Sequence, residues 1–263
     1  MPELPEVAAF QSYFDEAALE QPIVQTRIHD DKIFRNVDAL PFIQATAGER
    51  FIGSKRIGKY LFAELSNGQW VQFHFGMTGD FILYTDGLEK PRHERFHFEF
   101  ADGAKLGFDC PRKFARICLF ESFAECLESS GLGPDALTIS FPQFYEQAQG
   151  RKTTIKGFLL NQKILAGVGN LYADEVLWQA RIHPKSVTGK LSKSQLKKIW
   201  KLTQNILSDA VERRPYYKQY PNDWYWQWRK EGEKGPTGRG LVVSDKVAGR
   251  TTYWVEGVQK LFA

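Results

Sequence analysis

Met1-Pro2-Glu3-Leu4-Pro5-Glu6-Val7 opens the chain and places a proline directly after the initiator methionine, with a carboxylate beside it. We expect removal of Met1 in the cell because Pro2 is small, and the intact mass would verify it. Pro2 would then carry a free secondary amine, and an α-amino group with a pKa of about 7.7–8.0 is partly neutral and nucleophilic near pH 7. Such an amine can form an iminium with a sugar aldehyde while Glu3 moves protons. The alternative is a simple helix start, with Pro5 in its first turn.

Composition bounds the class of protein. The chain has 263 residues, with 43% hydrophobic and 25% charged residues, which predicts a globular protein of two medium domains or one domain with an appendage. A net charge of +4 and a pI near 8.8 permit nucleic-acid binding without requiring it. Cys110, Cys118 and Cys126 have no metal-ligand spacing, and their odd number favours a reducing compartment. No apolar run approaches about 18 residues and no leader is evident, so we expect a cytoplasmic protein with no membrane contact.

Hydrophobic periodicity predicts a strand-rich first half. A helix is expected from Val7 to about Leu19, where apolar residues recur at helical spacing. Segments 60–65, 70–75 and 96–100 have strand patterns, and Asn-Gly and Asp-Gly turns separate them. In the last of these, Phe96, Phe98 and Phe100 alternate with His97 and Glu99, which predicts a half-buried strand with the polar residues on its solvent face. Several short strands with close turns indicate a sandwich or a barrel.

The second half is predicted to be helical until its tail. Strand signals stop near residues 131–136, segment 141–149 favours a helix, and Ser192-x-x-Gln195 is a capping box. The tail is expected to return to strands. Trp224, Trp226 and Trp228 alternate, as in a strand with one aromatic face, and two further predicted strands flank a turn at about residues 245–249. A lone hairpin is marginally stable, so aromatic packing must support it.

Three loops of the first half could serve nucleic-acid chemistry. Arg56-Ile57-Gly58-Lys59 places a lysine at the start of a strand, Phe75-Gly76-Met77-Thr78-Gly79 places an apolar side chain between glycines, and Cys110-Pro111-Arg112-Lys113-Phe114 combines cations with an aromatic ring. Together these side chains could enter a base step and fill the space left by a displaced base. The alternatives are a solvated lysine, a core methionine and an ordinary basic turn.

A glycine-containing loop lies in the helical part. Gly167-Val168-Gly169-Asn170 precedes a predicted helix, so its backbone N–H groups could cradle a phosphate, and Asn170 could cap the helix or bind the phosphate itself. The alternative is a purely structural helix–turn–helix. Arg250, just after the predicted hairpin turn, could equally be a solvated side chain.

Taken together, these segments resemble the Fpg/Nei family of DNA glycosylases, formamidopyrimidine-DNA glycosylases in particular. The resemblance runs through the whole chain, and it rests on motifs in the order in which the family has them: Pro2–Val7, Gly58–Leu61, His74–Gly79, Pro111–Phe114, and Asn161-Gln162 through Gly167–Glu175. It implies an α+β fold with an N-terminal β-sandwich and flanking helices (1–132), a helix–two-turn–helix domain (133–215) and a zincless β-hairpin finger (216–263).

The resemblance also implies roles for matching positions. The catalytic set would be Pro2 as Schiff-base nucleophile, Glu3 as acid and base, Lys59 as general acid, and Arg250 on the finger as a phosphate contact that assists elimination. The DNA-binding set would be Met77, Arg112 and Phe114 in the gap left by the extruded nucleotide, Lys156 and Asn170 on phosphates, and His93, Arg151 and Lys152 as further contacts.

The chain departs from the family pattern in two places. The usual finger binds zinc through two Cys-x-x-Cys pairs, whereas the aligned positions here hold Gly235, Gly238, Val255 and Val258, so no metal or other cofactor is expected. Segment 212–228 is also shorter and more aromatic than the loop that covers an oxidised purine in typical members, which weakens the case for 8-oxoguanine.

The function expected from this resemblance is that of a monomeric, bifunctional DNA glycosylase and AP lyase of base excision repair. It would bind damaged double-stranded DNA, in a bacterium at the nucleoid, excise formamidopyrimidine (with 8-oxoguanine as a second candidate) and cleave the strand by β,δ-elimination. Two alternatives stay open: a Nei-like preference for oxidised pyrimidines or hydantoins, and a DNA- or lesion-binding protein without catalysis.

Overall fold

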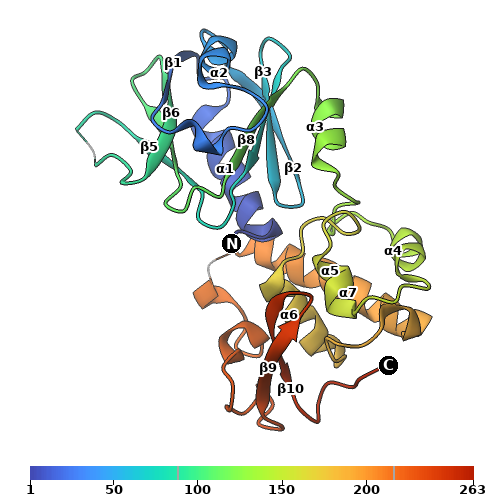
Figure 1. The fold of residues 1–263 in the computed structure, drawn as a ribbon. Helices are drawn as coiled ribbons and strands as arrows, with labels where there is room; N and C mark the ends of the chain where they lie inside the picture. Colours follow the sequence, from blue (N-terminus) through green and yellow to red (C-terminus); the bar gives the residue numbers. More distant parts are fainter. Residues whose placement is uncertain (88, 216) are drawn as a thin grey trace. The chain divides into compact units, whose positions relative to one another are not determined.

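The structure, a computed structural model, describes residues 1–87, 89–215 and 217–263. The chain forms two compact units, Met1–Gly131 and Leu132–Ala263 (Figure 1). The first of our expected domain boundaries, after residue 132, lies one residue beyond this division. The second involves Tyr216, which lies outside the described residues.

The first unit is a sandwich of two antiparallel four-stranded sheets, which confirms the predicted architecture. Its helices and strands follow in the order α1 (Leu4–Ala18), β1 (Ile23–Ile28), η1 (Asp31–Ile33), α2 (Ala39–Thr46), β2 (Phe51–Ile57), β3 (Tyr60–Leu65), β4 (Trp70–His74), β5 (Asp80–Tyr84), β6 (Glu94–Phe100), β7 (Lys105–Asp109), β8 (Arg116–Phe120) and α3 (Phe123–Ser130). One sheet has the order β1-β6-β7-β5 and the other the order β2-β3-β4-β8.

Phenylalanine rings fill the space between the two sheets. Phe14 of α1 lies 4.9 Å, ring centre to ring centre, from Phe51 of β2 and 5.4 Å from Phe81 of β5. Phe96 of β6 stacks on Phe108 of β7 at 5.3 Å. Because α1 contributes to this core, the residues that immediately precede it are fixed in place at the edge of the sandwich (Figure 1).

Strand β6 is more buried than its alternating pattern predicts. His97 is buried as well as Phe96 and Phe98, because its Nδ1 lies 3.0 Å from the buried Glu94 carboxylate. His29 Nε2 lies 2.8 Å from the same carboxylate. A polar cluster therefore occupies the face that the sequence pattern assigned to solvent.

The second unit is helical, with a hairpin at its end. Its elements are α4 (Phe141–Ala148), α5 (Ile155–Leu160), α6 (Asn170–Ala180), η2 (Thr188–Lys190), α7 (Lys193–Glu212), η3 (Tyr217–Gln219), η4 (Tyr225–Trp228), β9 (Val242–Val247) and β10 (Arg250–Val255). Strands β9 and β10 pair in register from Val242↔Val255 to Val247↔Arg250, and β10 packs against α6 (Figure 1). In the described part of the chain, no helix is long and apolar enough to cross a membrane.

The tryptophan-rich segment does not form the strand that its alternation suggested. Residues Tyr225–Trp228 form a 3₁₀ helix, because the Tyr225 N–H donates to the buried Glu175 carboxylate at 2.5 Å and not to a neighbouring strand. Trp224 and Tyr225 are both buried although they are adjacent. Adjacent buried side chains fit a helical turn and exclude a strand with only one buried face.

Candidate active site and nucleic-acid interface

Two loops of the first unit, residues 75–79 and 110–114, touch backbone to backbone. Gly76 has a φ of 62°, in the left-handed region that favours glycine. A Cβ placed on Gly76 would lie 2.4 Å from the carbonyl carbon of Phe114. This close approach requires glycine at position 76 and fixes one loop against the other. We call the pair the wedge loops.

The wedge loops present three side chains together. Met77 and Phe114 are 37% and 53% exposed, and the Arg112 guanidinium lies 5.0 Å from the centre of the Phe114 ring. The Arg112 backbone N–H donates to Thr78 Oγ1 at 3.4 Å, which links the two loops again. The structure therefore brings together the three residues that the sequence assigned to the gap left by a base.

Ion pairs and hydrogen bonds anchor the second wedge loop. Arg95 donates from Nε to the Cys110 carbonyl at 2.8 Å, and the Lys113 ammonium lies 2.5 Å from Asp30, whose pKa it lowers. The Cys110 N–H donates to the carbonyl of His93 at 3.0 Å. His93, one of the predicted DNA contacts, therefore lies next to this loop.

The predicted nucleophile and its carboxylate precede α1. Pro2 is half-buried and Glu3 is 5% exposed. Glu3 is the residue immediately before the helix, and its N–H donates to the Glu6 carboxylate at 2.9 Å. The helix thus begins at Leu4, earlier than the periodicity from Val7 suggested, and it fixes the backbone on which Pro2 stands.

Lys59 is buried at the turn between β2 and β3, where it is 7% exposed. Burial, together with the positive charges of Arg116 and Lys59, lowers the pKa of the nearby His74 to about 4. His74 is therefore neutral near pH 7, and its Nδ1 accepts a hydrogen bond from the Gly76 N–H at 3.2 Å. A neutral histidine thus connects the surroundings of Lys59 to the first wedge loop.

In the second unit, Gln162 organises the glycine loop. Its Oε1 accepts the Gly167 N–H at 2.9 Å, and its Nε2 donates to the Val168 carbonyl at 2.9 Å. The Gly167 N–H, one of the donors that could have faced a phosphate, is thus bound within the protein. Gly169 occupies the N-cap position of α6, so of the two roles open to Asn170 the structure excludes the capping of this helix.

Helix α6 holds the hairpin through two side chains one turn apart. Asn170 Nδ2 donates to the Thr251 carbonyl at 2.9 Å, and Asp174 Oδ2 lies 3.5 Å from the Tyr253 N–H. Residues 170 and 174 share a helix face, and residues 251 and 253 share an edge of β10. The position of Arg250, next to Thr251, therefore depends on α6.

Asp174 is also the centre of a buried ionic cluster. Its carboxylate lies 2.5 Å from Lys156 Nζ and 3.0 Å from Arg229 Nη2. Burial raises the pKa of Asp174, and the two cations oppose that rise. Lys156 is fully buried, so in this structure its ammonium group faces Asp174. We call Asp174, Lys156 and Arg229 the Asp174 cluster.

The remaining predicted contacts of the second unit differ in exposure. Arg151 folds back onto α4, where its Nε donates to the Gln147 carbonyl at 2.5 Å. Lys152 and Arg250 are exposed. These two cations are thus the most exposed of the predicted contacts of this unit.

Sequence reasoning missed Asp174 and Glu175 as structural residues. Glu175 is buried, and its carboxylate accepts hydrogen bonds from the Tyr225 N–H at 2.5 Å and from Gln179 Nε2 at 2.8 Å. Burial raises the pKa of Glu175 to about 7. The sequence did contain a signal for their burial: the two acids lie between apolar residues of one helix, and Asp174 follows Asn170 by one turn.

The hairpin base lacks the ligands through which the usual finger of the family binds zinc. Gly235, Gly238, Val255 and Val258 offer no side-chain ligand atom. A Cβ on Gly235 would lie 2.7 Å from a Val255 methyl group, so these two positions are in direct apolar contact. Buried Trp178, Tyr225, Val242 and Val255 form an apolar cluster here.

Comparisons with known proteins agree with this geometry. Residues 1–117 match the model of the formamidopyrimidine-DNA glycosylase N-terminal domain, and residues 131–218 match that of its H2TH domain. The formamidopyrimidine-DNA glycosylase of Arabidopsis thaliana is 34% identical over 100% of this chain and 72% of its own length. That of Mycoplasma pneumoniae is 30% identical over 98% of this chain and 99% of its own length.

Solved structures extend the agreement to three dimensions. The Lactococcus lactis Fpg in complex with DNA containing an abasic site superposes with a TM-score of 0.88 at 26% identity, over 98% of this chain and 100% of that one. The same enzyme in complex with DNA containing Fapy-dG also has a TM-score of 0.88 and 26% identity, with the same coverage. The chain therefore belongs to the formamidopyrimidine-DNA glycosylase family.

Proposed function

We propose that this protein is a bifunctional DNA glycosylase and AP lyase that removes oxidised bases from double-stranded DNA. The observation that carries the proposal is the N-terminal geometry, in which a buried carboxylate, Glu3, directly follows Pro2 on backbone fixed by α1. An N-terminal secondary amine beside a fixed carboxylate supplies a nucleophile and a proton carrier within one short segment.

The reaction would begin once Met1 has been removed. The lone pair of the Pro2 nitrogen forms a bond to the sugar C1′ while the glycosidic bond breaks and the departing base takes a proton. The sugar ring then opens: the C1′–O4′ bond breaks, Glu3 gives a proton to O4′, and an iminium remains between Pro2 and C1′. This cation acidifies the C2′ proton, and its removal expels the 3′ phosphate. A second elimination expels the 5′ phosphate, and water then releases the sugar fragment from Pro2.

The wedge loops support the step that precedes this chemistry. A base must leave the duplex before an enzyme can reach C1′, and the gap must be filled. Met77 and Phe114 are exposed apolar side chains, and Arg112 adds a cation beside the Phe114 ring. We propose that these three side chains enter the gap. Lys152 and Arg250 would contact phosphates, as would His93 next to the second wedge loop.

The choice of lesion is a separate question. Tyr220, Trp224 and Tyr225 of the aromatic segment are buried within the second unit, and the Tyr220 hydroxyl lies 2.6 Å from that of Tyr172. A segment packed in this way is less suited to folding over an oxidised purine than a free loop would be. This observation favours formamidopyrimidine and oxidised pyrimidines or hydantoins over 8-oxoguanine.

Borohydride trapping tests both points. The full-length protein, with loss of Met1 confirmed by intact mass, is incubated with duplexes that carry an abasic site, formamidopyrimidine, 8-oxoguanine or dihydrouracil. We expect a covalent adduct at Pro2, with the best-trapped base lesion giving the substrate class. Pro2→Gly should weaken base excision and Glu3→Gln should abolish it. Full excision by Glu3→Gln would refute the assignment, and no adduct on any duplex would leave a DNA-binding protein without catalysis.

A further inference from the structure

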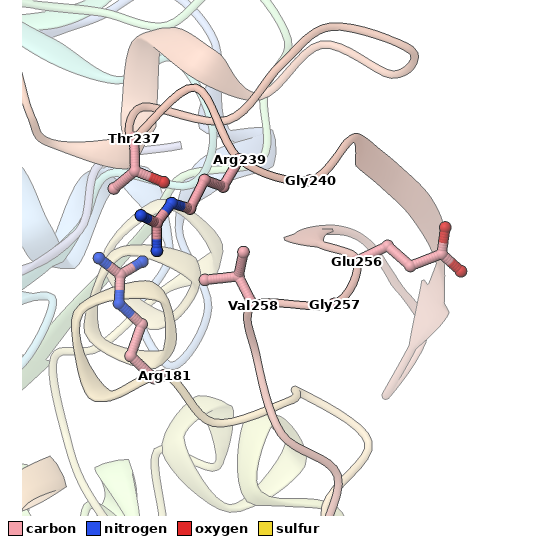
Figure 2. Close-up of a pocket in the computed structure, with 7 residues that line it drawn as sticks. All are labelled: Arg181, Thr237, Arg239, Gly240, Glu256, Gly257 and Val258. Carbon is pink, nitrogen blue, oxygen red and sulfur yellow. The ribbon is translucent and has the colours of Figure 1, made fainter.

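A hollow of about 650 Å³ lies at the base of the hairpin, within the second unit. Its walls are the end of α6 and the loops that precede β9 and follow β10. Figure 2 shows the guanidinium groups of Arg181 and Arg239 turned toward each other across it, with Thr237 beside them. Two facing cations repel each other, so this arrangement calls for an anion between them.

Arg181 is held rigidly. It ends α6 with a φ of 61°, and its N–H donates to the Trp178 carbonyl at 3.0 Å. Its guanidinium lies 3.8 Å from the centre of a Trp178 ring. In the described part of the chain, its Nη1 is buried and has no hydrogen-bond partner, and burial lowers the pKa of the group. A buried cationic donor without an acceptor is costly unless a ligand supplies one.

Arg239 stands on a folded loop. The Gly238 N–H donates to the Gly235 carbonyl at 2.8 Å, which closes a turn just before Arg239. On the other side, Gly240 has a φ of 68°, and a Cβ there would lie 2.3 Å from the Glu256 carbonyl oxygen. The backbone on both sides of Arg239 is therefore tied to the hairpin base, although its side chain is exposed.

The charges around the hollow favour an anion. Glu256 lines it, but Figure 2 shows its carboxylate directed away from the two guanidinium groups. The end of α6 contributes roughly half a negative charge. Two full positive charges outweigh that contribution, so the hollow is positive.

We propose that Arg181 and Arg239 form a phosphate-binding site, with Thr237 as an additional donor. Arginine presents a planar set of N–H donors that matches phosphate oxygens in a bidentate arrangement. Because β9 has six residues, the site lies about 20 Å along the hairpin from the turn that carries Arg250. It is thus separate from the phosphate contact proposed for Arg250.

Inorganic phosphate is the first probe, used on the full-length protein at constant ionic strength. The side-chain Nε–H signals of Arg181 and Arg239 are followed by NMR. We expect both to shift and saturate, and we expect Arg239→Ala to weaken the apparent affinity by about 10-fold or more, because hydrogen bonds to charged groups are lost. Lys234→Ala is the matched control, since Lys234 is an exposed cation of the same finger that does not line the hollow. It should change the affinity by less than about 2-fold.

Arg181→Lys separates geometry from charge, because lysine keeps the charge and loses the fork of donors. We expect it to weaken phosphate binding, and an affinity equal to that of the unsubstituted protein would contradict the bidentate arrangement.

Duplex DNA distinguishes the source of the phosphate, and only this second experiment depends on the proposed function. If the ligand is a backbone phosphate, Arg239→Ala should reduce the salt dependence of binding to a duplex of about 30 base pairs by about one counterion. If the duplex experiment shows no change and the phosphate titration does, the ligand is a free phosphate group. The proposal is overturned if Arg239→Ala and Lys234→Ala behave alike in both experiments, whatever the outcome of the trapping experiment.

Discussion

Replacing Asp174 by asparagine should destabilise the second unit more than most single substitutions do. The change keeps the shape of the side chain and removes its charge. Lys156, whose side chain is 0% exposed, and Arg229, whose side chain is 18% exposed, would then have lost the carboxylate that holds them. At an effective dielectric constant of about 20, the attraction of two charges about 3 Å apart is of the order of 5 kcal/mol.

Desolvation of the ions offsets much of that attraction while the cluster is intact. Once one partner is gone, the attraction is lost but the desolvation cost remains, because the other charge stays buried. We therefore expect Asp174→Asn to lower the free energy of unfolding by about 3–5 kcal/mol. Lys156→Met, which leaves Asp174 paired with the more accessible Arg229, should cost less, about 1–2 kcal/mol.

Urea unfolding followed by tryptophan fluorescence measures these values. The signal reports on the second unit, because every tryptophan except Trp70 belongs to it. The double variant Asp174→Asn/Lys156→Met removes the buried unpaired ammonium, so it should be more stable than Asp174→Asn alone, with a coupling energy of at least about 1.5 kcal/mol. Additive effects, or a loss below about 1 kcal/mol for Asp174→Asn, would refute this account of the cluster.

Two other predictions concern the wedge loops and the pH dependence of the second unit. Gly76→Ala should lower the free energy of unfolding by about 2 kcal/mol or more and abolish extrusion of a 2-aminopurine reporter, because its Cβ would meet the Phe114 carbonyl carbon at 2.4 Å. The control is Gly48→Ala: Gly48 also has a positive φ, +77°, but nothing lies within 4 Å of its Cβ. This variant should lose less stability and leave extrusion intact. Burial raises the pKa of Glu175 from 4.5 to about 7, so between these values the folded state keeps a proton that the unfolded chain has lost. The contribution of Glu175 to stability should therefore fall by about 3 kcal/mol as the pH rises through that window, and urea titrations of Glu175→Gln at several pH values should lack that fall.

The sequence predicted those parts of the fold that depend on neighbouring residues. Alternation of Phe96, Phe98 and Phe100 was enough to place strand β6, and the wedge loops were visible because glycine, methionine and arginine occur in short motifs. In the same way, the hairpin turn before Arg250 follows from local turn residues. Each of these signals lies within a window of a few residues, where backbone geometry decides the outcome.

Contacts between distant residues were not predictable in this way. Nothing local to Lys156 indicates that its ammonium meets Asp174, so the resemblance assigned it to phosphate alone. The alternating tryptophans likewise suggested a strand. The group that prevents one is the Glu175 carboxylate, which accepts the Tyr225 N–H and lies about 50 residues earlier, on α6, so no local pattern indicates it. The periodicity of a sequence indicates which residues are buried, but it does not specify the partners of charged and polar side chains.

The hairpin finger shows how this structure can form without zinc ligands. Structural zinc contributes about 10–16 kcal/mol in small finger peptides, which have little else to fold around. Here Val242 and Val255 are fully buried, and each such side chain contributes about 1.5–3 kcal/mol. Asn170 and the Asp174 cluster add polar contacts from α6. The finger is therefore stabilised by the helix that it packs against, and Arg250 is positioned by α6 where the family's usual finger would rely on a metal.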